Sequence, residues 1–127
     1  MLGPLRDKLT QAPATPAHPD YRRVDDIVIY QIPNRLTKFP SPAQPAGDLE
    51  RPQALERLLT NYARMNEQLE STPWLRNRST EAPPLKAVSG GAYDTMDGYQ
   101  WILAAAAHTE RHTKQVLEVM ADPGFPS

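Results

Sequence analysis

The run from Asp94 to Met120 constrains the fold more than any other stretch, because it alone is long and periodic enough to anchor a core. Its apolar residues recur at helical spacing, which predicts one long helix. Asp94 or Thr95 is the expected N-cap. Asp97 would then lie in the first turn, where an acidic side chain favours the positive end of the helix.

A helical projection divides this predicted helix into three faces. One edge carries Trp101, Ala105, His108, His112, Val116 and Val119. An adjoining apolar arc carries Tyr99, Ile102, Ala106, Thr113, Leu117 and Met120. A third face is predicted to point away from the core: Gln100, Ala104, Ala107, Arg111, Lys114 and Glu118. The first two faces span about half of the circumference, so the helix needs neighbours on more than one side.

Proline supplies 14 of the 127 residues, and most of these prolines lie before residue 53. Because proline breaks helix interiors, we predict a single domain over 1–127 with two unlike parts. Residues 1–47 form a proline-rich segment with short helices at Met1–Gln11 and Val24–Ile32. The β-branched residues of the second piece also suit a strand, but no second strand-like run is available to pair with it.

Residues 48–127 are predicted to hold two long helices and a connecting loop. The first helix, Pro52–Glu70, is amphipathic, and its apolar stripe is predicted to lie in the core: Leu55, Leu58, Leu59, Tyr62, Met65 and Leu69. Irregular connections are predicted at Asn34–Gly47 and Trp74–Tyr93, where prolines and glycines gather. The expected fold class is all-α, with long proline-rich loops.

Composition excludes several classes of function. The net charge of −1 gives no reason to expect nucleic acid or an anionic membrane surface as a partner. Cysteine is absent, which removes disulfides and thiol nucleophiles and fits a reducing cytoplasm. No apolar run approaches the roughly 20 residues that a membrane-spanning helix requires.

His108 and His112 are the residues with the clearest chemical potential. They lie four apart, so on a helix their rings share one face about a turn apart. Neutral imidazole binds zinc, nickel, iron or copper. The spacing alone leaves two interpretations open: a shared divalent metal, or two core histidines that each hydrogen-bond a loop carbonyl.

The sequence His-Thr-Glu-Arg-His differs from the zincin motif, which needs glutamate directly after the first histidine. Glu110 comes two residues after His108, on the other side of the helix, and is expected to form a salt bridge or a hydrogen bond. Gln115 reaches the rim of the histidine face, and Trp101 lies on the same edge. Both are expected to support the metal ligands without binding the ion themselves.

The segment Tyr99–Pro126, YQWILAAAAHTERHTKQVLEVMADPGFP, closely resembles the last helix of DinB-like proteins. That superfamily includes metal-dependent hydrolases and thiol-dependent S-transferases of bacteria. The segment IPNRLTKFPSPAQPAG and the helix at Pro52–Glu70 look like the middle loop and third helix of the family. The resemblance covers most of Val24–Ser127 and is strongest in the last helix.

This resemblance implies a four-helix bundle, often dimeric, that holds a metal with three histidines. His108 and His112 match the pair on the last helix of the family. The third histidine comes from near the end of the second helix, and Met1–Gln11, which looks like the tail of that helix, contains none. His18 lies in the linker beyond it. The chain thus resembles the C-terminal portion of a DinB-like protein, without the first helix and most of the second.

Three functional hypotheses follow. The first is a cytoplasmic metal-dependent hydrolase or thiol transferase acting on a small molecule, whose third ligand comes from another subunit or from His18. The second is a non-catalytic helical module that homodimerises to cover its apolar face. The third is a truncated, inactive fragment that is marginally stable alone.

Overall fold

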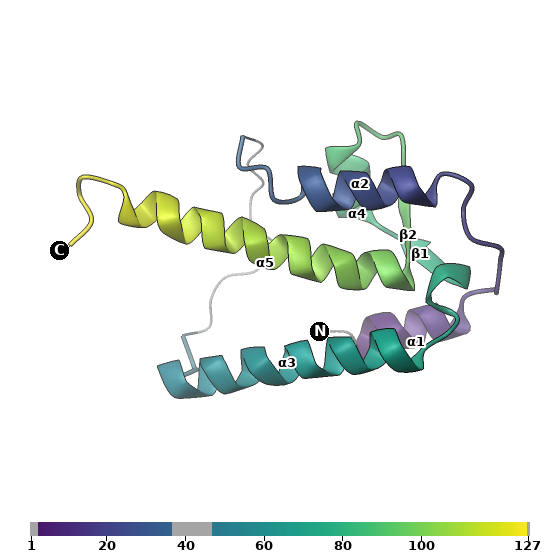
Figure 1. Ribbon diagram of the computed structural model, residues 1–127, viewed down its shortest axis with the longest axis horizontal. Helices are drawn as coiled ribbons and strands as arrows, with labels where there is room; N and C mark the ends of the chain where they lie inside the picture. Colours follow the sequence, from purple (N-terminus) through teal and green to yellow (C-terminus); the bar gives the residue numbers. More distant parts are fainter. Residues whose placement is uncertain (1–2, 37–46, 127) are drawn as a thin grey trace.

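The computed structural model describes residues 3–36 and 47–126, and 64% of these residues are helical. The elements follow in the order α1 (Gly3–Gln11), α2 (Tyr21–Gln31), α3 (Arg51–Ser71), the 3-10 helix η1 (Leu75–Asn77), β1 (Ser79–Glu81), α4 (Pro83–Val88), β2 (Thr95–Asp97) and α5 (Gly98–Met120) (Figure 1). Helices were predicted at four of these places, and all four are confirmed. Most of the predicted loop Asn34–Gly47 lies outside the described residues.

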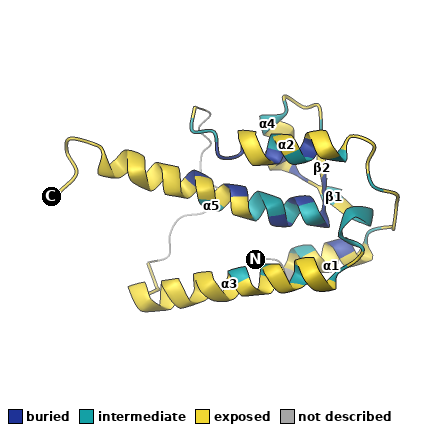
Figure 2. Cartoon of the chain, in the orientation of Figure 1, coloured by how far each residue is buried: buried dark blue, intermediate teal, exposed yellow. Residues whose placement is uncertain are grey.

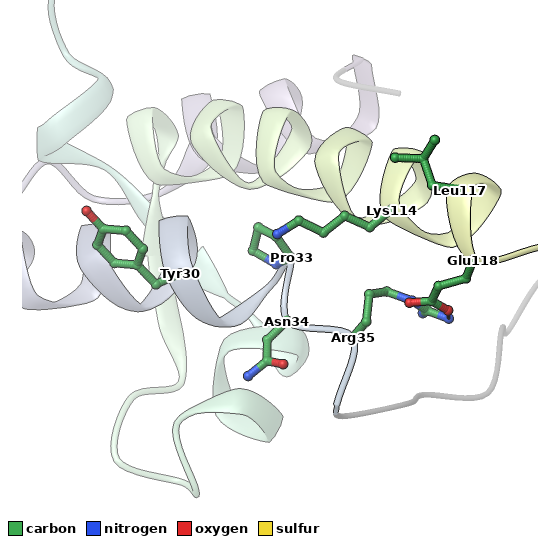
Figure 3. A pocket seen from close by; sticks show the side chains of 7 residues that line it. All are labelled: Tyr30, Pro33, Asn34, Arg35, Lys114, Leu117 and Glu118. Atoms are coloured by element: carbon green, nitrogen blue, oxygen red, sulfur yellow. Dashed lines mark hydrogen bonds and ion pairs between the residues drawn. The ribbon is translucent and has the colours of Figure 1, made fainter. Parts of the chain in front are cut away.

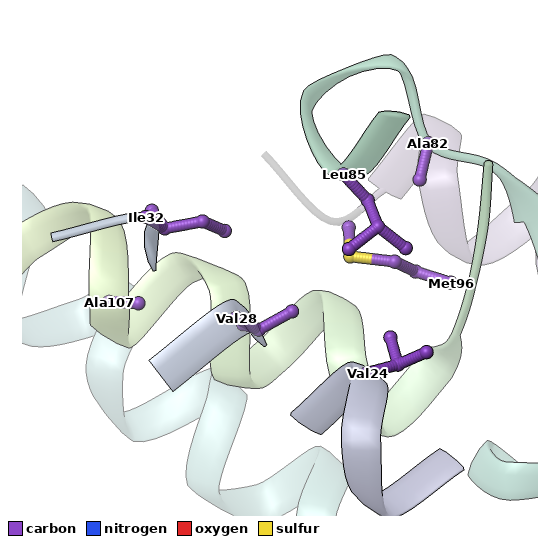
Figure 4. Close-up of a cluster of buried hydrophobic side chains, with 7 residues drawn as sticks. All are labelled: Val24, Val28, Ile32, Ala82, Leu85, Met96 and Ala107. Atoms are coloured by element: carbon purple, nitrogen blue, oxygen red, sulfur yellow. The ribbon is translucent and has the colours of Figure 1, made fainter. Parts of the chain in front are cut away.

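Helix α5 lies between α2 and α3 in Figure 1, and the main core forms where α2 packs on the first half of α5. The buried cluster joins α2, α4, β2 and α5 through Val24, Val28, Ile32, Ala82, Leu85, Met96 and Ala107 (Figure 4). Val24 and Val28 lie four apart on α2, so they share the face that turns to the core. Within the described chain, no helix combines the length and apolarity that a membrane crossing needs.

The predicted start of the last helix at Asp94 is wrong, because Thr95–Asp97 form strand β2. This strand pairs with β1 in antiparallel register, with Thr80 opposite Met96. The helix begins at Gly98, and Asp97 is its N-cap. The Asp97 carboxylate accepts from the Gln100 backbone N–H at 2.7 Å, and the Gln100 side chain accepts from the Asp97 N–H at 3.0 Å. This reciprocal pair is a capping box, with glutamine as the returning side chain.

The predicted irregular connection Trp74–Tyr93 holds more regular structure than expected. It contains η1, β1 and α4. Pro83 and Pro84 begin α4, because proline is tolerated in the first turn of a helix. Gly90 and Gly91 then reverse the chain toward β2 with φ of +62° and +85°, a region that glycine enters without steric cost.

The prediction that the α3 stripe lies in the core is wrong. No residue of α3 is buried, and the helix is exposed along most of its length (Figure 2). Leu55, Leu58, Leu59 and Leu69 remain 39% to 59% exposed. The N-terminus of α3 is nevertheless capped, because the Glu50 N–H donates to the Gln53 side chain at 3.0 Å. Pro52 lies in the first turn of the helix. Its apolar face therefore has little cover from the described residues.

The predicted outward face of α5 is confirmed at Lys114 and Glu118, which are exposed, and is wrong nearer the start of the helix. Gln100, Ala107 and Arg111 are buried, whereas the apolar residues at the far end of the helix are exposed. Burial of the two polar side chains is tolerated because both are hydrogen-bonded. Arg111 donates to the carbonyl oxygens of Ile32 at 3.1 Å and Asn34 at 2.7 Å, so it binds the backbone at the end of α2.

A partly buried ionic network joins α2, η1 and the start of α5. The Arg76 guanidinium donates to both carboxylate oxygens of Asp25, at 2.8 and 2.6 Å, and to Asp97 at 3.2 Å. It also lies over the rings of Tyr99 and Tyr21, 4.0 and 4.7 Å from their centroids. Burial raises the pKa of the Asp97 carboxyl, although its hydrogen bond to Gln100 and the charge of Arg76 act in the opposite direction.

Gly98 gives a specific stability prediction. A Cβ at this position would lie 2.7 Å from a Leu75 methyl carbon and 3.2 Å from the Leu75 carbonyl oxygen. We expect Gly98→Ala to lower the free energy of unfolding by about 1–2 kcal/mol, because η1 must shift to relieve this overpacking. Urea denaturation followed by circular dichroism measures the change, and an unaltered or higher midpoint would contradict the close approach.

Candidate metal-binding site

The structure brings His108 and His112 together on the exposed surface of α5. Their Nε2 atoms lie 2.9 Å apart, and the ring planes are nearly perpendicular with centroids 4.4 Å apart. The contact follows directly from the i, i+4 spacing on a continuous helix. The two imidazoles therefore point their outer nitrogens at one another and not at backbone carbonyls.

Gln115 contacts the second ring of the pair. Its side-chain oxygen lies 3.2 Å from Nδ1 of His112. An amide oxygen only accepts hydrogen bonds, so in this arrangement Nδ1 of His112 carries the hydrogen and Nε2 presents its lone pair. This is the tautomer that a metal ligand needs at Nε2, and a hydrogen bond on the opposite ring nitrogen commonly holds it.

The spacing of the two nitrogens is close to that of two ligands on one ion. Zinc–nitrogen bonds of about 2.0–2.1 Å at a tetrahedral angle separate two donor atoms by about 3.3 Å. The observed Nε2–Nε2 distance is 2.9 Å. At this distance Nε2 of His108 donates a hydrogen bond to Nε2 of His112. An ion bound to both nitrogens would replace this hydrogen and widen the spacing.

The pKa of His108 is lowered from the ordinary imidazole value. Partial burial of the ring is the main cause, and the nearby His112 ring and Arg111 guanidinium act in the same direction. Metal ions bind the neutral form of imidazole. His108 therefore stays competent as a ligand at lower pH than an ordinary histidine does.

This lowered pKa predicts a pH response of the metal-free protein. The folded chain takes up fewer protons at His108 than the unfolded chain, whose value is the ordinary 6.5. Stability is therefore unaffected by this group above pH 6.5, and declines as the pH falls from there through the lower folded-state pKa. We expect His112→Asn to raise the His108 pKa, because one neighbour that lowers it is removed. Titration of the His108 ring by NMR tests both points, and a midpoint above 6.5 in the unaltered chain would contradict them.

No third ligand joins the pair within the described chain. Among residues 3–36 and 47–126, no group of three His, Cys, Asp or Glu side chains could hold a metal ion. His18 packs edge-on against Tyr93 near the start of α2, with its Nδ1 accepting from the Asp20 N–H at 3.1 Å. The described structure thus gives half of a site.

The other predicted site residues have identifiable partners. Trp101 donates its indole N–H to the Thr80 hydroxyl at 3.1 Å, so it ties α5 to β1, and its support of the histidines stays a prediction. Glu110 forms an i, i+4 salt bridge with Lys114 at 2.8 Å, which confirms its expected structural role.

Sequence reasoning missed Arg111 as a neighbour of the pair. A projection of α5 places this residue with the polar side chains, which gives no sign that it is buried. Only the position of the α2 carbonyl groups, known from the fold, explains why an arginine lies there. Its charge lowers the pKa of His108 and anchors the helix next to the histidines.

A wide depression of about 620 Å³ lies beside the end of α2, away from the histidine rings. Its lining comes from two segments, with Tyr30, Pro33, Asn34 and Arg35 on one side and Lys114, Leu117 and Glu118 on the other (Figure 3). The Arg35 guanidinium donates two hydrogen bonds of 3.1 Å to the Glu118 carboxylate across it. The charges that could bind a ligand here already have partners, since Arg35 pairs with Glu118 and Lys114 pairs with Glu110.

Comparison of the chain with protein-family models, curated proteins and solved structures finds no match. The resemblance to DinB-like proteins therefore stays a prediction from the sequence.

Proposed function

We propose that this chain is a metal-binding helical protein in which His108 and His112 hold a divalent transition ion. The observation that supports this most directly is the 2.9 Å approach of the two Nε2 atoms at an exposed position. Two imidazoles and no thiolate suit zinc, nickel or iron. The Gln115 oxygen would orient the His112 ring from behind.

We propose further that the protein is related to the DinB-like superfamily and its four-helix bundles. The long helices α3 and α5 and the exposed apolar stripe of α3 are consistent with a helical bundle. The chemistry that this assignment adds is hydrolysis or thiol transfer on a small molecule, with the ion activating water or a thiol. Such catalysis needs an open coordination position beside the protein ligands.

Zinc titration of the purified, metal-free protein tests the proposal. We expect His108→Ala to weaken zinc binding by about 100-fold or more, because one of two ligands is lost. His18→Ala is the matched control, since it removes the third histidine of the chain and should leave the affinity unchanged. Equal effects of the two substitutions, or no zinc binding by the unaltered chain, would refute the assignment.

A second candidate is a non-catalytic helical module that homodimerises. The exposed leucines of α3 favour it, because soluble monomers rarely leave such stripes uncovered. Light scattering of the metal-free protein distinguishes the two candidates. A well-folded monomer at micromolar concentration would remove dimerisation as an activity independent of metal.

A further inference from the structure

The histidine pair supplies only half of the ligands that a metal ion needs. Zinc in proteins takes four ligands in a tetrahedral arrangement, and the described residues add no further histidine, cysteine or carboxylate to the two rings. Both rings lie on exposed residues of α5, where another molecule can reach them. We propose that a second copy of this chain completes the site, so that one ion is bound by His108 and His112 of both copies. This inference rests on the metal binding proposed above.

The symmetry of a dimer fits the placement of the two histidines. They are equally spaced about Glu110, halfway along the four-residue interval. When two α5 helices cross antiparallel at this level, a two-fold axis sets His108 of each copy opposite His112 of the other. Four Nε2 atoms then converge on the axis, and each pair already has a spacing close to that of a tetrahedral site.

The surface around the rings is suited to contact with itself. We call it the histidine strip, and it consists of Ala105, His108, His112, Gln115, Val116 and Val119. Trp101 borders the strip, packs against the core and donates to Thr80. With neutral histidines it carries no charge, so two copies bring no like charges together. The same axis sets Val116 at the level of Ala104 and Val119 at the level of Trp101. Val116 of one copy thus faces a small side chain of the other copy, whereas Val119 faces a large one.

The chain leaves more surface exposed than a compact monomer of its mass. The chain exposes 9435 Å², whereas a compact monomer of this mass exposes about 6,800 Å². Eight large apolar side chains on α3 and α5 are about half exposed: Leu55, Leu58, Leu59, Leu69, Val116, Leu117, Val119 and Met120. At roughly 100 Å² of apolar surface each when fully exposed, they present about 400 Å² per copy. A standard interface buries about 800 Å² per partner, somewhat over half of it apolar.

A shared ion would have a structural role. Four imidazoles fill a tetrahedral coordination shell and leave no position for water. The metal would then join two copies. Because it binds the dimer and not the single chain, it would stabilise the dimer, in which the apolar faces cover each other. This differs from the open site that hydrolysis or thiol transfer would need.

Sedimentation velocity with and without zinc, combined with calorimetric stoichiometry, tests the shared site. We expect the metal-free chain to sediment as a lighter species and to double in mass on adding half an equivalent of zinc. Cobalt(II) in place of zinc should give the absorption of a tetrahedral site at the same stoichiometry. The double variant His108→Ala, His112→Ala should not change in mass when zinc is added.

Val116→Glu provides a second test that leaves both histidines in place. A carboxylate in the histidine strip should block docking, abolish the zinc-dependent increase in mass and weaken zinc binding by at least about tenfold. Leu117→Glu is the matched control, because Leu117 is equally exposed on the same helix but lies outside the strip. Circular dichroism of both variants verifies that the helices remain folded.

The outcomes separate this inference from the proposed function. One full equivalent of zinc bound by a monomer would overturn the shared site and leave metal binding by His108 and His112 intact. Equal effects of Val116→Glu and Leu117→Glu on dimer mass would also overturn it. Absence of zinc binding at any protein concentration would overturn both proposals.

Discussion

Replacing Arg76 with alanine is expected to lower the free energy of unfolding by about 3 kcal/mol, because removing one partner of a buried ion pair leaves the other uncompensated. Asp25 and Asp97 keep only 16% and 5% of their side-chain surface exposed, and Arg76 is their common cation. Without it, two carboxylates remain close together in a poorly solvated place. The capping of α5 and the attachment of α2 should weaken together.

Arg35→Ala is the matched control for this prediction. Arg35 also forms a two-bond contact with a carboxylate, but its partner Glu118 is 49% exposed. We expect a loss of less than about 1 kcal/mol, as for other solvated ion pairs. Urea unfolding of both variants gives the comparison, and equal losses would mean that the Arg76 network is as solvated as the surface pair.

Leu85→Ala is expected to be the most damaging single truncation in the core, at about 3 kcal/mol. Leu85 has no exposed surface, and it lies in the cluster that joins α4 to α2 and to Met96 of β2 (Figure 4). A cavity there loses contacts on several elements at once. Thermal and urea unfolding should both move to clearly lower midpoints.

Leu55→Ala is the comparison for this truncation. Leu55 is 56% exposed on α3, so a monomer should lose no more than about 0.5 kcal/mol. Unfolding at several protein concentrations adds information, because a leucine covered by another copy would cost more as the dimer becomes populated. A loss equal to that of Leu85→Ala in dilute monomer would contradict the exposed position of α3.

Four helices of this fold, α1, α2, α3 and α5, could be predicted from the sequence, since their periodicity is a local property, whereas the six-residue α4 was missed. Val24 and Val28 on α2 and the long run ending at Met120 are examples. The small sheet could not, because each strand has only three residues and exists through its partner. The extended conformation of Thr95–Asp97 is favoured by the burial of Met96, which depends on contacts distant in sequence.

The histidine pair could be predicted because four residues on one helix fix the distance between two rings. The orientation of α5 in the fold could not be predicted. Hydropathy placed Gln100 and Arg111 outside, yet both are buried because the α2 backbone and Asp25 offer them partners. It placed Leu58 and Leu59 inside, yet nothing in the described chain covers them well. A projection gives the faces of a helix, but it does not identify which face has a neighbour.

Arg111 is the last buried residue of α5, so the stretch from His112 to Met120 lies on the surface, where the Arg35–Glu118 pair joins it to the segment after α2. At 1.5 Å per residue this stretch is about 13 Å long. Its backbone hydrogen bonds can break turn by turn from the free end without opening the core, so its local opening free energy is low. His112 lies on the segment that frays, and His108 lies on the anchored part of the helix. The alignment of the two rings therefore depends on how much of the segment is helical.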